Sequence, residues 1–82
     1  MKVQLTYVFE TKGGFRYERE TPEEIIQIVH DNYEALKDMA SNGDSVNMTM
    51  DFTEIYFPKA TISACIGGVW RYYNLYTEAR PL

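Results

Sequence analysis

Residues 60–77 read ATISACIGGVWRYYNLYT, two alternating runs joined by the pair Gly67 and Gly68. Two glycines between alternating segments are typical of a two-residue β-hairpin turn, because both turn positions then accept positive φ. With the glycines in the turn, the cross-strand pairs follow directly. They are Ile66 with Val69, Cys65 with Trp70, Ala64 with Arg71, Ser63 with Tyr72 and Ile62 with Tyr73. The stretch therefore predicts an antiparallel hairpin of fixed register.

The two faces of this hairpin differ in composition. One face carries aliphatic side chains that suit packing beneath a helix: Ile62, Ile66, Val69 and Leu75. The other carries Trp70, Tyr72 and Tyr76, here called the aromatic ladder, beside small polar residues. Because a single helix covers one side of a sheet, we expect the aromatic ladder to lie on the face that the helix leaves open.

A helix signal precedes the hairpin in the chain. Thr21, Pro22 and Glu24 suit the N-cap, N1 and N3 positions of a capping box. On a helical wheel, residues 22–40 divide into an apolar arc and a polar arc, and residues 41–43 supply a left-handed exit. The pattern predicts one amphipathic helix.

Alternation with a period of two predicts further strands on both sides of the helix. Residues 2–10 and 15–20 alternate around the glycines at 13 and 14, which indicates a first hairpin. Residues 46–52 alternate again, but the apolar phase slips by one near Thr53 and Glu54. The slip requires either a bulge or a turn, and the pattern does not decide between them.

Together these elements predict an α+β fold. We expect an antiparallel sheet of about four to five strands with one amphipathic helix packed on one face, in the order ββα followed by three or four β-strands. No repeat, linker or low-complexity segment divides the sequence, so residues 1–82 are expected to form a single domain.

Charge and composition narrow the functional classes. The 82 residues carry 12 acidic and 8 basic side chains, a formal net charge of −4, which disfavours binding to nucleic acid. Cys65 is the single cysteine and excludes an intramolecular disulfide. No apolar stretch reaches the length of a membrane span. We therefore expect a cytoplasmic protein that does not enter a membrane.

Side chains suited to catalysis or metal binding are sparse. His30 lies on the polar helix arc, and Cys65 has no neighbouring base in the sequence to activate its thiol. The polar residues from the third strand onward do not have the spacing of a calcium-binding loop; they are Asp44, Asn47, Asp51 and Glu54. We therefore predict no catalytic residue, no metal site and no cofactor.

Two surfaces remain as candidates for recognition. The acidic helix face, defined by Glu23, Asp31, Glu34 and Asp38, favours a protein partner with a basic surface. The aromatic ladder supplies rigid contact area for a partner or for a homodimer. We therefore predict a non-catalytic protein-binding module. In general character it is similar to phage or mobile-element inhibitors of host defence proteins, although no motif carries that similarity.

The alternative belongs to another class. It is a small-ligand binder or enzyme with a site at a homodimer interface, built from Tyr72, Arg71 and a carboxylate such as Glu54. Stacking of nucleobases on the aromatic ladder is a third reading, but it requires a second helix and basic flanks that this sequence lacks. A ligand screen by thermal shift tests the small-ligand class, because a ligand that binds only the folded state raises the melting temperature.

Overall fold

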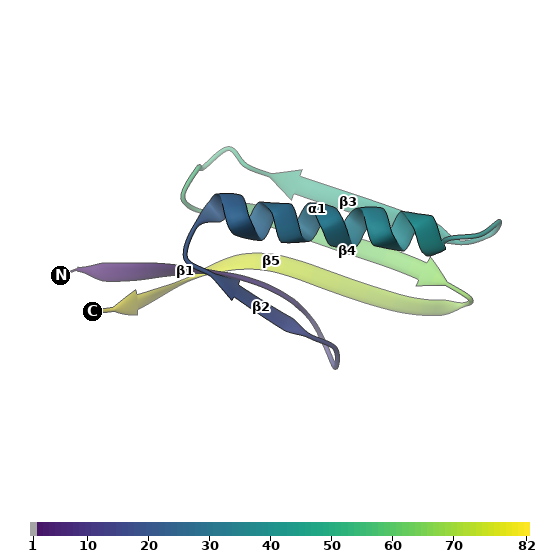
Figure 1. The fold of residues 1–82 in the computed structure, drawn as a ribbon, viewed down its shortest axis with the longest axis horizontal. Coiled ribbons are helices and arrows are strands. Elements are labelled where there is room, and N and C mark those ends of the chain that lie inside the picture. The colour runs from purple at the N-terminus through teal and green to yellow at the C-terminus, as the bar shows by residue number, and fades with distance from the viewer. Residues whose placement is uncertain (1) are drawn as a thin grey trace.

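The structure, a computed structural model, describes residues 2–82 and has the element order ββαβββ (Figure 1). The elements are β1 (Val3–Thr11), β2 (Arg16–Arg19), α1 (Pro22–Met39), β3 (Ser45–Asp51), β4 (Lys59–Ile66) and β5 (Val69–Pro81). All five strands pair antiparallel in one sheet of order β2-β1-β5-β4-β3. The predicted α+β class is confirmed, with three strands after the helix.

Strands β1 and β5 form the centre of the sheet. Their register runs from Val3 opposite Pro81 to Thr11 opposite Tyr73. The amide of Leu82 extends the pairing by donating to the carbonyl of Lys2 at 3.2 Å. As a result, the N and C ends lie at the same end of the molecule (Figure 1). Strand β5 also continues to Pro81, beyond residue 77, where the alternating sequence pattern ended.

The hairpin of β4 and β5 has the predicted register. Ile66 pairs with Val69 and Ile62 with Tyr73, and the three pairs between them are also as predicted. Gly67 and Gly68 have φ values of 60° and 79°, the positive values that a type I′ turn requires at both central positions.

Helix α1 begins as the sequence indicates and ends differently. Thr21 is the N-cap, and its hydroxyl oxygen accepts from the amide of Glu24 at 3.4 Å. The Thr21 hydroxyl also donates to the Glu24 carboxylate at 2.9 Å, so the capping box closes between side chains. The C-cap, Ala40, is extended rather than left-handed. The positive φ comes later, at Gly43 with 91°, in the turn that leads into β3.

The phase slip near Thr53 is a turn. Strand β3 ends at Asp51, and residues 52–58, here called the 52–58 loop, carry the chain to β4. Within this loop the amide of Phe57 donates to the carbonyl of Glu54 at 3.0 Å. Four apolar side chains of the loop are exposed, namely Phe52, Ile55, Tyr56 and Phe57, whereas Pro58 at its end is buried.

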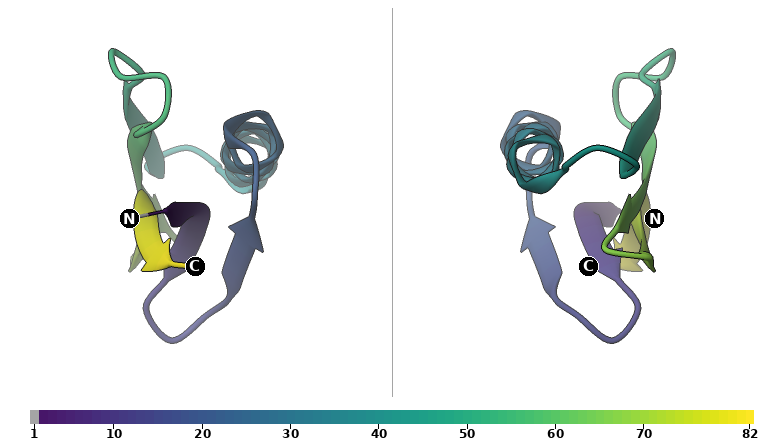
Figure 2. Two further views of the ribbon diagram at one scale, coloured as in Figure 1. Left: turned by 90° about the vertical axis from the view of Figure 1, so that its left-hand side faces the viewer. Right: turned by 90° about the vertical axis from the view of Figure 1, so that its right-hand side faces the viewer.

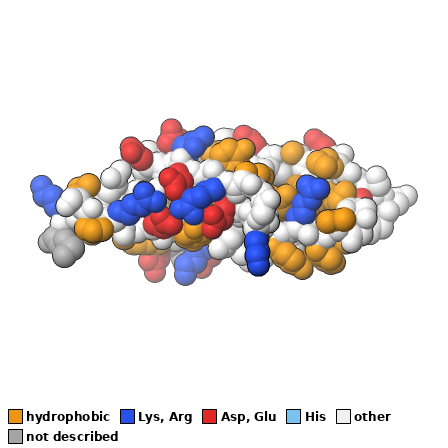
Figure 3. Space-filling view, turned by 90° about the horizontal axis from the view of Figure 1, so that it is seen from below, with side chains coloured by type: hydrophobic (Ala, Val, Ile, Leu, Met, Phe, Trp, Pro, Cys, Tyr) orange, Lys and Arg blue, Asp and Glu red, His pale blue; other side chains and the backbone are white. Residues whose placement is uncertain are grey.

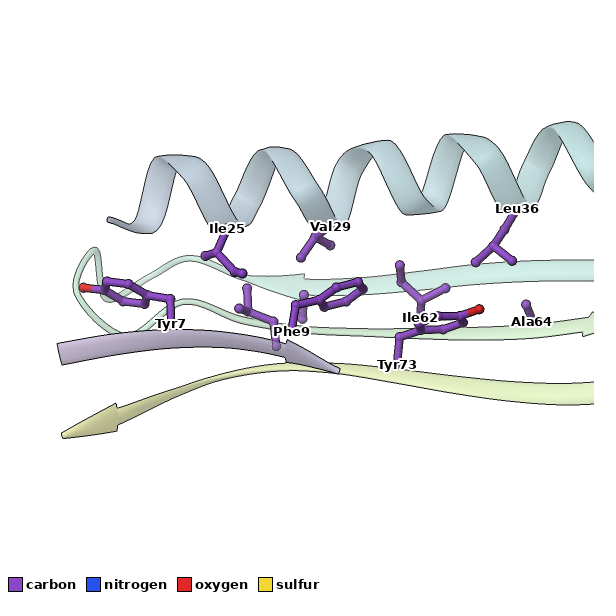
Figure 4. Close-up of a cluster of buried hydrophobic side chains, with 10 residues drawn as sticks. Tyr7, Phe9, Ile25, Val29, Leu36, Ile62, Ala64 and Tyr73 are labelled. Atoms are coloured by element: carbon purple, nitrogen blue, oxygen red, sulfur yellow. The ribbon is translucent and has the colours of Figure 1, made fainter. Parts of the chain in front are cut away.

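The core lies between α1 and the sheet (Figure 4). Ile25, Val29 and Leu36 are the buried residues of the helix. They pack against buried side chains of three strands: Tyr7 and Phe9 of β1, Ala60, Ile62 and Ala64 of β4, and Tyr73 and Leu75 of β5. Met39, although on the predicted apolar arc, is 56% exposed. The buried stripe of α1 is therefore narrower than the apolar arc that the sequence predicts.

The sheet curls at β1, so that β2 lies on the same side as α1 (Figure 2). Aromatic contacts accompany this curl: the ring of Phe15, just before β2, lies 6.2 Å from that of Phe9 and 5.7 Å from that of Tyr73. Phe15 thereby packs against the core, next to the strand that curls toward the helix side. The opposite side of the sheet, here called the uncovered face, has no helix over it.

Candidate functional site

The aromatic ladder lies on the uncovered face, as predicted. Tyr73 and Leu75 of β5 point into the core, so the alternate positions Trp70, Tyr72 and Tyr76 point away from it. Trp70 is 54% and Tyr72 62% exposed. Their rings are nearly parallel, with an interplanar angle of 7° and centroids 5.9 Å apart. We call these two residues the stacked pair.

Tyr76 has a different environment from the stacked pair. Its ring is half-buried. Its hydroxyl donates to Glu10 at 2.8 Å and accepts from Arg16 at 2.9 Å. Burial, and secondarily the hydrogen bond to Glu10, raises the pKa of this hydroxyl. The structure thus divides the aromatic ladder into a free stacked pair and a tyrosine that is held in a polar network.

That network, here called the charge network, spans three strands. Arg16 of β2 contacts Glu10 at 2.9 Å, Glu18 at 2.8 Å and Glu78 at 2.9 Å. Arg80 contacts Glu78 at 2.7 Å and Glu18 at 3.5 Å. Acidic and basic side chains gather in the middle of the molecule, while hydrophobic side chains lie toward the end where the β4–β5 hairpin turns (Figure 3).

The charge network changes the acidity of its members. Hydrogen bonds to Glu78 first, and then to Glu18 and Glu10, raise the pKa of Arg16 above its ordinary value. The pKa of Glu10 is lowered, first by the Tyr76 hydroxyl and then by Arg16. The pKa of Glu78 is lowered, first by Arg80 and then by Arg16. All these groups are thus held in their charged forms, which suits a structural role rather than proton transfer.

Open hollows run along the uncovered face beside the aromatic ladder. One, of about 360 Å³, lies between the 52–58 loop and Tyr76. Another, of about 700 Å³, lies beside Tyr72 and reaches the β1–β2 turn. Both are lined by Thr61 and Asn74, so the hollows adjoin. The surface next to the stacked pair is therefore concave and of mixed polarity.

The acidic helix face lies on the other side of the molecule. Glu23, Asp31, Glu34 and Asp38 are all exposed on α1. Lys37 partly offsets this charge, since its ammonium is 3.9 Å from Glu34. The helix and the uncovered face are on opposite sides of the sheet. The structure therefore does not bring the two predicted surfaces together.

The residues of the alternative site do not converge within one chain. Arg71 pairs with buried Ala64, so it lies on the side of the sheet that faces α1, whereas Tyr72 lies on the uncovered face. Glu54 is in the 52–58 loop, at the opposite end of β4 from the Gly67 turn. A site built from these three groups requires a second chain.

The remaining candidate groups are dispersed. His30 is exposed on α1, and Cys65 is half-buried on β4 opposite Trp70. Within residues 2–82, no group of three His, Cys, Asp or Glu side chains is arranged to hold a metal ion. Among these described residues, no helix is both long enough and apolar enough to cross a membrane.

Comparisons with protein-family models, with curated proteins and with solved structures found no match.

Sequence reasoning missed the charge network and its hold on Tyr76. The signal was present in part. Glu10, Arg16 and Glu18 alternate along the chain with the aromatic residues Phe9, Phe15 and Tyr17, so they lie on the opposite face of the sheet. Glu78 and Arg80 belong to the same network only because β5 lies next to β1. That adjacency is not readable from local sequence patterns.

Proposed function

We propose that the protein is a non-catalytic binding module that recognises another protein through the stacked pair on its uncovered face. The observation that carries this proposal is the parallel stacking of Trp70 and Tyr72, both more than half exposed. Large exposed aromatic side chains mark contact surfaces, because burying them against a partner removes much apolar area from water.

Rigidity and shape support the same proposal. The hydroxyl of Thr11 donates to the carbonyl of Tyr72 at 2.7 Å, which fixes the backbone beneath the ring. Each ring also restrains the other by stacking, so little conformational entropy remains to be lost on binding. The hollow beside Tyr72 offers space for a side chain of the partner.

The chemistry of the surroundings favours a protein over a nucleic acid. The hollow beside Tyr72 is lined by one acidic and one basic residue, Glu10 and Lys12, and the whole chain carries a net charge of −4. Phosphate backbones are repelled by such a charge balance. The acidic helix face, on the opposite side, strengthens the negative field that draws in a partner with a basic surface. Its contribution is to the rate of encounter rather than to direct contact.

The setting of such binding follows from the same features. A chain with one cysteine and no disulfide suits a reducing compartment such as the cytoplasm. Blocking of a host defence protein, as by phage or mobile-element inhibitors, is one form that binding by a small acidic module takes. In that case the host defence protein would offer the basic surface that the acidic module binds.

The test compares two double variants in capture from a lysate of the source organism. Trp70→Ala with Tyr72→Ala removes the stacked pair, and Ile55→Ala with Tyr56→Ala removes apolar groups of the 52–58 loop that are at least as exposed. A photoreactive residue in place of Tyr72 identifies what touches the surface. With the purified partner, we expect the first variant to weaken affinity by at least about 30-fold, because the loss of even one central aromatic costs roughly 2 kcal/mol.

A second measurement uses Trp70 as a built-in reporter. It is the single tryptophan, so its fluorescence must move toward shorter wavelength when a partner buries it. Reversing Glu34 and Asp38 to Lys is expected to slow association and leave dissociation nearly unchanged. Equal affinities of the two double variants, with no shift in the fluorescence of Trp70, would falsify the proposal.

A further inference from the structure

The two edges of the sheet are protected to different degrees. Edge strand β2 has four residues and carries charges at Arg16, Glu18 and Arg19. Edge strand β3 has seven residues, SVNMTMD, with neither lysine nor proline and with its one charge at the last position, Asp51. Natural proteins block open sheet edges with charges, prolines or short strands, because unpaired N–H and C=O groups accept another strand. The β3 edge lacks these devices.

The sequence of β3 is also complementary to itself. In an antiparallel pair centred on Met48, two copies of the strand overlap along their full length. Val46 then meets Met50 on the side of the sheet that faces α1, and Asn47 meets Thr49 on the uncovered face. Asp51 meets Ser45, so no like charges lie opposite each other. Such matching of residue types across a two-fold axis is the requirement of an isologous interface.

We propose that β3 pairs with β3 of a second copy of this chain, joining two five-stranded sheets into one continuous antiparallel sheet. This inference is independent of the function proposed above, because the stacked pair on β5 lies two strands away from the edge. It remains exposed in both copies.

Apolar side chains near the β3 edge support pairing with a second copy of the chain. Val46 and Met48 are partly buried against the core, and Met50 is 44% exposed. A second strand covers all three and extends the core across the two-fold axis. At its ends, this pairing places the start of the 52–58 loop of one copy beside the turn that precedes β3 of the other.

The test uses two double variants at exposed positions that differ in the sign of the charge at residue 49. Asn47→Lys with Thr49→Lys places lysine opposite lysine twice across the two-fold axis. Asn47→Lys with Thr49→Glu places lysine opposite glutamate twice and is the matched control. Both positions are exposed, and their partners within the chain are Ser63 and Thr61, so neither variant faces a charge in its own sheet. Circular dichroism checks that both variants are folded.

Sedimentation equilibrium from about 1 μM to about 1 mM covers the affinities expected of a small interface. A salt concentration of about 0.15 M screens the repulsion between two acidic chains. We expect a dimer for the wild type and for the lysine–glutamate variant. We expect the dimer of the lysine–lysine variant to be weaker than that of the control by at least about tenfold. A monomeric wild type, or equal dimerisation of the two variants, overturns the proposal.

A register-specific disulfide provides a second measurement. In a Cys65→Ser background, Met48→Cys places two thiols directly opposite each other at the two-fold axis, whereas Asn47→Cys places the thiol opposite Thr49. We expect the first variant to form a covalent dimer under mild oxidation and the second to remain largely monomeric. Equal cross-linking of the two excludes this register. The variant with alanine at Trp70 and Tyr72 should dimerise like the wild type, which separates this proposal from the proposed function.

Discussion

Arg16 of β2 donates to the carboxylate of Glu78 on β5 at 2.9 Å, across the strand β1 that lies between them. Val8 of β1 lies on the uncovered face between these strands, opposite Glu18 and Tyr76, and is nevertheless fully buried. The charge network therefore covers this part of the sheet as the helix covers the other side. It also fastens the short edge strand β2 to the centre of the sheet.

Substitution of Arg16 by alanine is expected to lower the melting temperature and to speed amide exchange in β2. The change removes the cation that Glu10, Glu18 and Glu78 share, so that only Glu18 and Glu78 keep a basic partner, Arg80, and it exposes Val8 to water. Because the groups are partly exposed, the loss should shrink as salt is added. Lys12→Ala, which removes an exposed cation from the β1–β2 turn, is the control and should melt close to the wild type. Equal melting of the two variants would show that the network contributes no stability.

Acid is expected to destabilise the fold through Glu10 and Glu78. Both have a folded-state pKa below the ordinary value of 4.5, so each contributes stability that is complete above that value and is lost as the pH falls through the lowered one. The free energy of unfolding should therefore decrease as the pH drops below about 4.5. Denaturant titrations at several pH values measure this slope.

The matched variant for this pH dependence carries Gln at both positions. Glu10→Gln with Glu78→Gln cannot lose charge in acid, so its stability should fall less steeply with decreasing pH. The slope does not vanish, because the pKa of Asp51 is also lowered by its hydrogen bonds to Thr53. An unchanged acid slope in the double variant would assign the pH dependence to other groups.

Two isoleucines offer a matched test of the core. Ile62 of β4 is fully buried, and Ile55 of the 52–58 loop is 70% exposed. Ile62→Ala should lower the free energy of unfolding by about 2–5 kcal/mol, since it removes buried methyl groups and leaves a cavity. Ile55→Ala should change it by no more than about 0.5 kcal/mol. Chemical denaturation of both variants decides the matter, and comparable losses would contradict the placement of the 52–58 loop outside the core.

Asp44 connects two turns that are distant in sequence. Its carboxylate accepts from the amide of Ser41 at 2.9 Å and from the amide of Gly67 at 3.1 Å, and these hydrogen bonds lower its pKa. Asp44→Ala should therefore speed exchange of both amides and lower the melting temperature. Asp44→Asn, which keeps one acceptor oxygen, should fall between it and the wild type. Asp38→Ala, at an exposed helix position, serves as the control and should leave both amides protected.

Local signals in the sequence accounted for the elements whose partners are close in the chain. Gly67 and Gly68 determine a two-residue turn, and the register of β4 and β5 follows from it without further information. Thr21 and Pro22 likewise place the start of α1. The alternation on β5 was sufficient to place the stacked pair opposite the core. In each case a short-range steric or hydrogen-bonding requirement selects one structure.

Features that depend on pairing between distant segments were not predictable. The contact of β1 with β5 joins residues such as Val3 and Pro81, and nothing in either segment specifies the other. The half-buried state of Tyr76 follows from that contact, because Glu10 and Arg16 reach it from neighbouring strands. The turn at Thr53 was ambiguous for another reason: a bulge and a turn shift the alternation by the same single residue.

The central place of β1 and β5 also constrains how the molecule forms. While β5 is still missing, the sheet consists of two separate pieces, the β1–β2 hairpin and the β3–β4 pair. No backbone hydrogen bonds of the sheet join these two pieces. Such dependence on sequence-distant pairing makes folding slow, and it delays the shared interior until the last strand has been synthesised. Until then Phe9 and Ile62 are exposed to water, so a chaperone that holds nascent chains has most to protect in this interval.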